Sequence, residues 1–154
     1  MREILFKAKR KDNGEWVEGY YLKYIKPSNG EIEHRIFVSD GDGVTWYTVT
    51  EDTLCQYTGL TDKNGKKIWE NDILFDDDVY SLVRWDEEEA RFVIDDYGTK
   101  GCLMEYGWDE DAGRYDVVDT NGFDDFTTPV SDFLKVVGNK FDHPELMKGE
   151  EHDT

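Results

Sequence analysis

Apolar and polar residues alternate in many short stretches of this chain, and turn-forming residues separate the stretches. The longest stretch lies between Asp12-Asn13-Gly14 and Pro27-Ser28-Asn29-Gly30, and it places four large apolar residues at positions of one parity: Trp16, Tyr20, Leu22 and Tyr24. Side chains two residues apart share one face of a strand. The pattern therefore predicts a strand over residues 16–25 whose apolar face packs inward.

The same pattern predicts further short strands and little helix. Residues 35–38 and 45–49 read as a hairpin around Asp40-Gly41-Asp42-Gly43, because glycine adopts the positive φ of tight turns. The other β-type segments are 4–8, 54–60, 67–75, 79–85, 91–94, 104–108, 115–118 and 133–137. Helical periodicity is not sustained over three turns anywhere, although residues 128–133 and 143–148 could each form one turn. Many short strands indicate a mainly β barrel or sandwich.

Three segments of the chain resemble the YopX family of phage and mobile-element proteins. They are EILFKAKRKDNGEWVEGYY (residues 3–21), QYTGLTDKNGKKIWENDILF (56–75) and VVGNKFDHPEL (136–146). The resemblance implies a small SH3-like barrel or roll with additional strands, a single domain over residues 1–148, and no assigned activity. Residues 149–154 are then a frayed acidic tail. Asn71 stands where the family usually has Gly, and Asn tolerates the left-handed conformation better than other non-Gly residues.

The central segment 56–75 has a structural explanation and a functional one. Structurally, Asp62 can cap its own turn, Asn64-Gly65 supplies the positive φ, and the chain then returns to a buried strand. Functionally, the charged residues of the segment could form an interaction surface made of Asp62, Lys66, Glu70 and Asp72. We regard the structural role as the main one for this segment and keep the interaction surface as a hypothesis.

The acidity of the chain is concentrated in its second half. The formal charge is −18; residues 1–75 contribute −2 from 11 basic and 13 acidic residues, and residues 76–154 contribute −16 from 7 and 23. This change, together with Asp76-Asp77-Asp78, suggests a soft boundary near residue 76. Nucleic-acid affinity rests on Lys and Arg that displace counterions, so direct nucleic-acid binding is not expected.

The basic cluster Lys7, Lys9, Arg10 and Lys11, which has little aromatic sequence nearby, and the patch Lys63, Lys66 and Lys67 could meet phosphate locally. Alternatively, they could pair with the acidic half of the same molecule or of a neighbouring copy, which favours a homo-oligomer.

Sequence motifs for catalysis, metals and cofactors are missing. Neither acidic loop, residues 40–43 or 109–113, fits a calcium loop, and the Cys and His residues lack zinc spacing: Cys55, Cys102, His34, His143 and His152. We expect both cysteines to be structural and His143 to be a turn residue. No nucleophile elbow, phosphate loop or dinucleotide fingerprint occurs. We therefore expect no metal or cofactor and lean against an enzyme.

The aromatic content exceeds what a small core needs, and exposed aromatics mark contact surfaces. The tryptophans to examine are Trp46, Trp69, Trp85 and Trp108.

The N-terminal apolar run is too short for a signal peptide and no stretch suits a membrane span, so we expect a cytoplasmic protein, in the host cell if phage-encoded. Its expected role is a noncatalytic interaction or assembly module. The alternatives are an acidic decoy that imitates DNA to occupy a host protein, and a carboxylate-based metal-dependent hydrolase.

Overall fold

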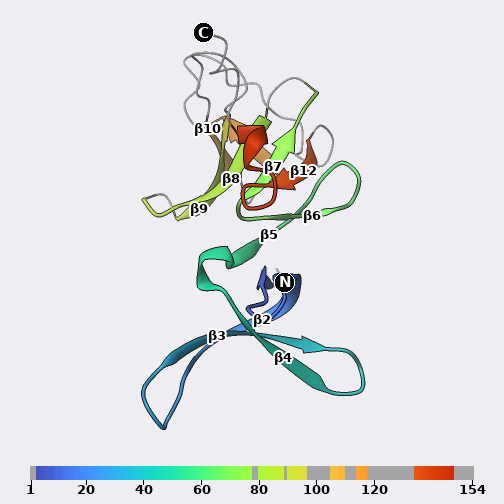
Figure 1. Cartoon of the computed structure of the whole chain (residues 1–154). Coiled ribbons are helices and arrows are strands. Elements are labelled where there is room, and N and C mark those ends of the chain that lie inside the picture. Colours follow the sequence, from blue (N-terminus) through green and yellow to red (C-terminus); the bar gives the residue numbers. More distant parts are fainter. Residues whose placement is uncertain are drawn as a thin grey trace. The chain divides into compact units, whose positions relative to one another are not determined.

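The computed structural model describes residues 3–77, 80–88, 90–96, 105–109, 114–117 and 134–147. The chain divides into two compact units, Met1–Tyr57 and Thr58–Thr154, drawn in Figure 1. Several expectations lie outside the described residues: the placement of Cys102 and His152, the turn at 128–133 and the tail at 149–154. The division at residue 57 differs from the soft boundary near residue 76, which lies between two paired strands.

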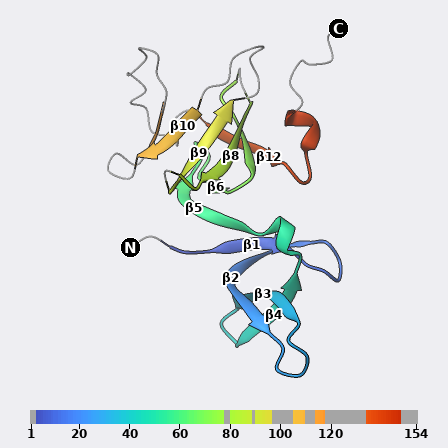
Figure 2. The ribbon, with the colours of Figure 1, turned by 90° about the vertical axis from the view of Figure 1, so that its left-hand side faces the viewer.

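The first unit is an antiparallel sheet in the order β4-β3-β2-β1-β5, in which β1 to β4 pair consecutively and β5 returns to pair with β1. Its elements are β1 (Phe6–Lys9), β2 (Trp16–Ile25), β3 (Ile32–Ser39), β4 (Val44–Val49), the short 3-10 helix η1 (Glu51–Thr53) and the start of β5 (Cys55–Thr61). The expected turns occur where predicted: Gly14 and Gly30 have positive φ, and the Asp40 N–H donates to the Gly43 carbonyl at 3.3 Å in the β3–β4 hairpin. Figure 2 shows these strands in blue and teal.

The sheet of the first unit curls until the end of β4 meets the residues at the end of β1. Arg10 and Val49 form an isolated bridge, flanked by Lys11 N–H to the Thr48 carbonyl at 3.0 Å and Thr50 N–H to the Lys9 carbonyl at 2.9 Å. Elsewhere the strand order stays open. Among the described strands we therefore find two antiparallel sheets rather than the closed small barrel that the family resemblance implied.

One face of this sheet packs on a small core, and it is the opposite face from the one expected. Ala8, Ile36 and Val49 are fully buried, with Val17 and Tyr21 of β2 packed against them. These β2 residues have odd numbers, so the expected inward parity of Trp16, Tyr20, Leu22 and Tyr24 lies on the other face. The prediction of the inward face was wrong because the core side contains smaller apolar residues and Gly19, which permits close approach: a Cβ there would lie 2.1 Å from the Phe37 carbonyl oxygen.

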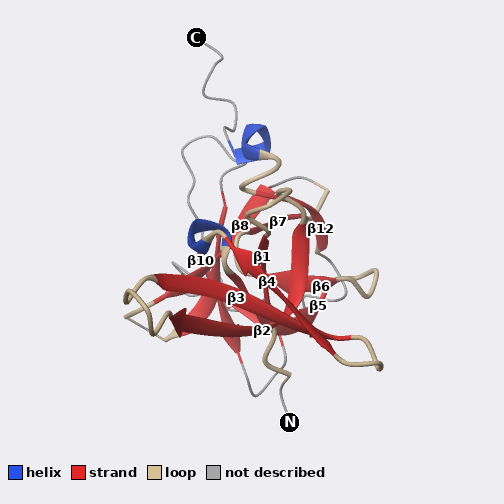
Figure 3. Cartoon of the chain, turned by 60° about the horizontal axis from the view of Figure 1, so that its bottom comes forward, coloured by secondary structure: helices blue, strands red, loops and turns tan. Residues whose placement is uncertain are grey.

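The second unit continues from β5 and contains a second antiparallel sheet. Its strand order is β11-β10-β9-β8-β7-β12, and the end of β5 pairs with β6. The bounds are β6 (Lys67–Trp69), β7 (Asp72–Phe75), β8 (Tyr80–Asp86), β9 (Arg91–Asp96), β10 (Glu105–Asp109), β11 (Arg114–Val117), β12 (Lys135–Asn139) and the 3-10 helix η2 (Pro144–Met147). Figure 3 shows that strands dominate the described residues.

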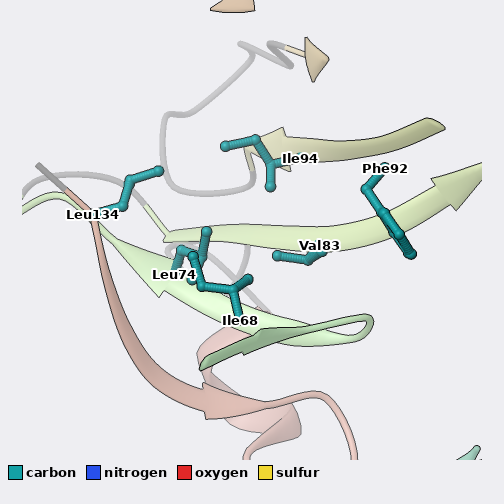
Figure 4. Close-up of a cluster of buried hydrophobic side chains, with 6 residues drawn as sticks. All are labelled: Ile68, Leu74, Val83, Phe92, Ile94 and Leu134. Atoms are coloured by element: carbon teal, nitrogen blue, oxygen red, sulfur yellow. The ribbon is translucent and has the colours of Figure 1, made fainter. Parts of the chain in front are cut away.

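The core of the second unit comes from residues far apart in the sequence. Figure 4 shows its buried side chains, which belong to β6, β7, β8, β9 and the residue before β12: Ile68, Leu74, Val83, Phe92, Ile94 and Leu134. Because β7 pairs with both β8 and β12, the 136–146 segment is placed beside the 56–75 segment.

The prediction of a mainly β chain with little helix is confirmed. In the described part of the chain, no helix is long and apolar enough to cross a membrane.

Candidate functional site

Asp62 is a buried carboxylate that holds three backbone N–H groups. Its Oδ1 accepts from Asn64 and Lys66, both at 2.9 Å, and its Oδ2 accepts from Val136 at 2.8 Å. Burial alone raises the pKa of a carboxyl, but here these three donors and the nearby Lys66 charge outweigh it, so the pKa of Asp62 lies below its ordinary value. The predicted turn-capping role is confirmed, and the same side chain also joins the 56–75 segment to the 136–146 segment.

Asp72 and Trp69 are also buried parts of the scaffold. The Trp69 N–H donates to Asp72 Oδ2 at 2.8 Å, and the intervening turn contains Asn71 with φ +72°. Asn71 therefore adopts the left-handed conformation expected at this position. Its N–H donates to the Val83 carbonyl at 2.7 Å and its own carbonyl accepts from Lys140 at 3.0 Å.

The expected interaction surface of Asp62, Lys66, Glu70 and Asp72 is only partly at the surface. Lys66 is exposed and Glu70 half-buried, but Asp62 and Asp72 are each 2% exposed because their oxygens are directed at backbone donors. Trp69 is buried as well. The structure thus leaves Asp62, Asp72 and Trp69 inaccessible to a partner.

The other candidate tryptophans differ in their surroundings. Trp85 is half-exposed on β8 and meets Phe92 edge to face, with 5.0 Å between ring centroids. Trp108 lies on β10 opposite Tyr115 of β11, and its side chain lies outside what the structure describes. Trp46 lies on β4 of the first unit.

Three strands bring Trp46 into a ladder on the outer face of the first sheet. Tyr20 pairs with Phe37, and Phe37 pairs with Trp46, so the three side chains share one face. The neighbouring rung contains Arg35, whose guanidinium carbon lies 3.8 Å from the ring centroids of both Tyr24 and Trp46. Such stacking holds the rings in place at an otherwise solvated face.

Charged groups fix this arrangement further. Arg35 Nη2 lies 2.8 Å from Glu33 Oε2, and Lys26 Nζ lies 3.0 Å from Glu33 Oε1. Hydrogen bonds from Lys26 and Arg35 hold the pKa of Glu33 below its ordinary value. At the other end of the sheet, the Lys7 and Lys9 ammonium groups lie 4.7 and 5.4 Å from the Trp16 ring centroid. The basic cluster therefore has an aromatic partner that its local sequence did not reveal.

The outer face of the first sheet remains open to solvent despite its apolar composition. Tyr20 is 60% exposed, Leu22 46%, Val44 65% and Trp46 45%. We call these four residues the outer apolar face. Antiparallel sheets that pack one face on a core normally present polar residues on the other, so this face is unusual for a strand pair that already has a core.

A pocket of about 410 Å³ lies in the first unit, with His34 in its wall. His34 Nδ1 lies 2.6 Å from the Tyr21 hydroxyl, and its Nε2 lies 3.2 Å from Glu51 Oε2. Burial, together with the Glu51 charge, raises the pKa of Tyr21, so the phenol stays protonated and can donate to His34. Lys11 and Lys23 also line the pocket. Sequence reasoning missed this constellation because its residues meet only when β2, β3 and β4 pair and the end of β1 bridges to β4.

The other described Cys and His residues, Cys55 and His143, have structural placements. Cys55 is buried, and its thiol donates to the Thr53 carbonyl at 3.2 Å. His143 lies in the turn after β12, where its N–H donates to the Asn139 carbonyl at 2.8 Å and its ring covers Gly138. Within the described residues, no group of three His, Cys, Asp or Glu side chains is arranged to hold a metal ion.

The fold and these placements define a mainly β protein of two antiparallel sheets whose sequence signature is built into the scaffold of the second unit. The model of the YopX family, described as YopX protein, matches residues 5–148, so the chain belongs to the YopX family. It is similar to the crystal structure of protein EF1440 from Enterococcus faecalis, with 22% identity, a TM-score of 0.42 and coverage of 96% of this chain and 100% of that one. No curated protein matches the chain.

Proposed function

We propose that this YopX-family protein is a noncatalytic interaction module that assembles with further copies of itself, in the cytoplasm. The observation that supports this proposal is the outer apolar face of the first sheet. β2 directs its more apolar parity, with Tyr20 and Leu22, away from the core and toward solvent. Contiguous exposed apolar side chains of this kind mark protein contact surfaces.

The rigidity of the face also favours a contact role. Trp46 and Tyr24 are stacked on Arg35, and Trp46 lies 6.5 Å from Phe37 between ring centroids. Side chains that are already ordered lose little conformational entropy when a partner covers them. The SH3-like roll that the family resemblance implies would suit such a scaffold, and the single bridge between Arg10 and Val49 is compatible with it.

The test is the mass of the protein in solution, measured by light scattering over a range of concentrations. A mass of two or more chains of 18.0 kDa supports assembly, whereas a monomer at every concentration would refute it. Trp46→Lys should weaken association because it places a charge on the outer apolar face. Trp85→Lys is the matched control, since Trp85 is a similarly exposed tryptophan on a strand of the other unit.

The two other hypotheses remain predictions. A decoy that imitates DNA needs rows of exposed carboxylates, and Asp62 and Asp72 cannot belong to such rows because they are buried. A carboxylate-based hydrolase would need convergent acids around a substrate. The charge of the chain predicts no binding to duplex DNA at physiological salt, and a gel shift that persists there would contradict this.

A further inference from the structure

β4 lies at the end of the first sheet and has an unprotected edge. It pairs with β3 on one side, while on the other side the described residues reach only its last residues, through the bridge between Arg10 and Val49. Among the described residues, therefore, no strand pairs with the second edge of the stretch from Val44 to Tyr47, which we call the free edge. Val44 and Trp46 on this stretch are both exposed large apolar residues.

The composition of β4 sets it apart from the other strands at sheet ends. Natural edge strands are usually blunted by charge, proline, a bulge or short length. β6 contains Lys67, β11 contains Arg114 and Asp116, and β12 contains Lys135 and a register shift. β4, with the sequence VTWYTV, has six uncharged residues and none of these devices.

The direction of the backbone groups along this edge follows from the bonds that β4 already makes. The Thr48 carbonyl accepts from Lys11 and the Thr50 N–H donates to Lys9, so residues of even number direct their backbone away from β3. Alternate residues of an antiparallel strand bond to opposite sides. The N–H and carbonyl groups of Val44 and Trp46 therefore point outward along the free edge.

We propose that the occupant of this edge is β4 of a second copy of the chain, paired antiparallel about a two-fold axis through Thr45. This inference rests on the proposed function. In this register Val44 of each copy faces Trp46 of the other, which forms four backbone hydrogen bonds and uses only free donors and acceptors. A register centred on Trp46 would instead face Val44 with Thr48, whose carbonyl already accepts from Lys11.

Side chains support the same register. The two Thr45 residues meet at the axis, and Val44 faces Trp46 on the outer apolar face; Thr–Thr and aromatic–β-branched pairs are both favourable across strands. Two residues further along, Lys11 of the same copy already occupies the edge at Thr48, so Asp42 of the second copy lies next to Lys11 where its chain leaves β4 at the hairpin tip, without pairing with Thr48. Among the described residues Lys11 forms no ion pair, and Asp42 is exposed at the hairpin tip, where its N–H donates to Asp40 Oδ1 at 3.0 Å. The acidic hairpin tip thus meets the basic cluster.

The first experiment removes one outward donor while keeping the side chain's size. Val44→Pro deletes the Val44 N–H at the first residue of β4, a strand position that tolerates proline. The matched control is Val44→Thr, which keeps the N–H and a β-branched shape. We expect light scattering to show that Val44→Pro halves the wild-type mass and that Val44→Thr leaves it unchanged, with circular dichroism confirming that both variants are folded.

A charge exchange tests the register, and it also tests the edge pairing itself if Val44→Pro does not fold. Lys11→Glu and Asp42→Lys should each weaken association at least tenfold, and the double variant should restore it. An oligomer that none of these changes affects would overturn the edge pairing but leave the assembly function standing. A wild-type monomer at all concentrations would refute both, and an extended segment of a different protein would then be the occupant to seek.

Discussion

Replacement of Asp62 by Asn tests whether the family signature is scaffold. The two side chains have nearly the same shape, and Asn retains one carbonyl oxygen that can accept from Asn64 and Lys66. Its amide group, however, replaces the oxygen that accepts the Val136 N–H at 2.8 Å. Two donors then face each other at the point where the 56–75 and 136–146 segments meet.

The size of the effect follows from this loss. A hydrogen bond to a charged group contributes about 1.5–3 kcal/mol, and a buried donor left without an acceptor costs about 1–3 kcal/mol. Since Asp62 is 2% exposed, water cannot replace the missing acceptor. We expect Asp62→Asn to lower the free energy of unfolding by about 2–3 kcal/mol, which corresponds to roughly 5–10 °C in Tm for a chain of this length.

The pH dependence gives a second, independent signature of Asp62. Its pKa in the folded state lies below 3.8, the ordinary Asp value, so the unfolded state binds a proton at higher pH than the folded state does. Its contribution to stability is therefore present above about pH 4 and is lost as the pH falls through the folded-state pKa. The Asn variant should lack this part of the acid destabilisation.

Urea unfolding at neutral pH and at about pH 3 measures both effects. Asp77→Asn is the control, because Asp77 is exposed and lies 3.5 and 3.9 Å from the ammonium groups of Lys135 and Lys63, so it should change stability by less than about 0.5 kcal/mol. If Asp62→Asn were as stable as the wild type at neutral pH, the scaffold role of this carboxylate would be refuted.

Three further predictions follow from the packing and the charge. Gly138→Ala should destabilise the fold by about 1–3 kcal/mol in urea, because its Cβ would lie 2.5 Å from His143 Nδ1; an unchanged midpoint would show that the ring moves freely. Arg35→Lys should cost about 1 kcal/mol, since an ammonium cannot stack on Tyr24 and Trp46 together, and equal stability would contradict the stacking. Raising NaCl from about 20 to about 200 mM should raise Tm by screening repulsion within a chain of charge −18, and a fall in Tm would contradict this.

The parts of the fold that local chemistry determines were predictable from the sequence. Asn64-Gly65 marked a tight turn, and Gly65 has φ +79°; Asn71 was expected to adopt the left-handed conformation, and it does. The contact from Asp62 to Val136 was not predictable, because it depends on the pairing of β7 with β12 rather than on any local signal. The sequence therefore predicted that Asp62 caps its own turn, but not that it joins this turn to β12.

The outer apolar face shows a different limit of sequence reasoning. Tyr20 and Leu22 do share one face of β2, as predicted, but the assignment of that face to the core was wrong. The alternating pattern separates the two faces of a strand without saying which one is buried. Gly19 was the missed signal: a residue that allows close backbone approach marks the packed side. Likewise, the charge change near residue 76 does not coincide with the division of units at residue 57, since surface charge affects solubility and association more than it affects fold.

These placements separate stability from recognition along the chain. Asp62, Asp72 and Trp69 are buried in the second unit, so substitutions there should act on folding, whereas Val44 and Trp46 are exposed in the first unit, so substitutions there should act on association. If the two roles are separate, the effects of Asp62→Asn and Val44→Pro on the free energy of unfolding should add, once the stabilisation that association gives is subtracted. A coupling energy larger than about 0.5 kcal/mol would show that Asp62, in the second unit, affects the association made through β4 of the first unit, and the two roles would then not be separate.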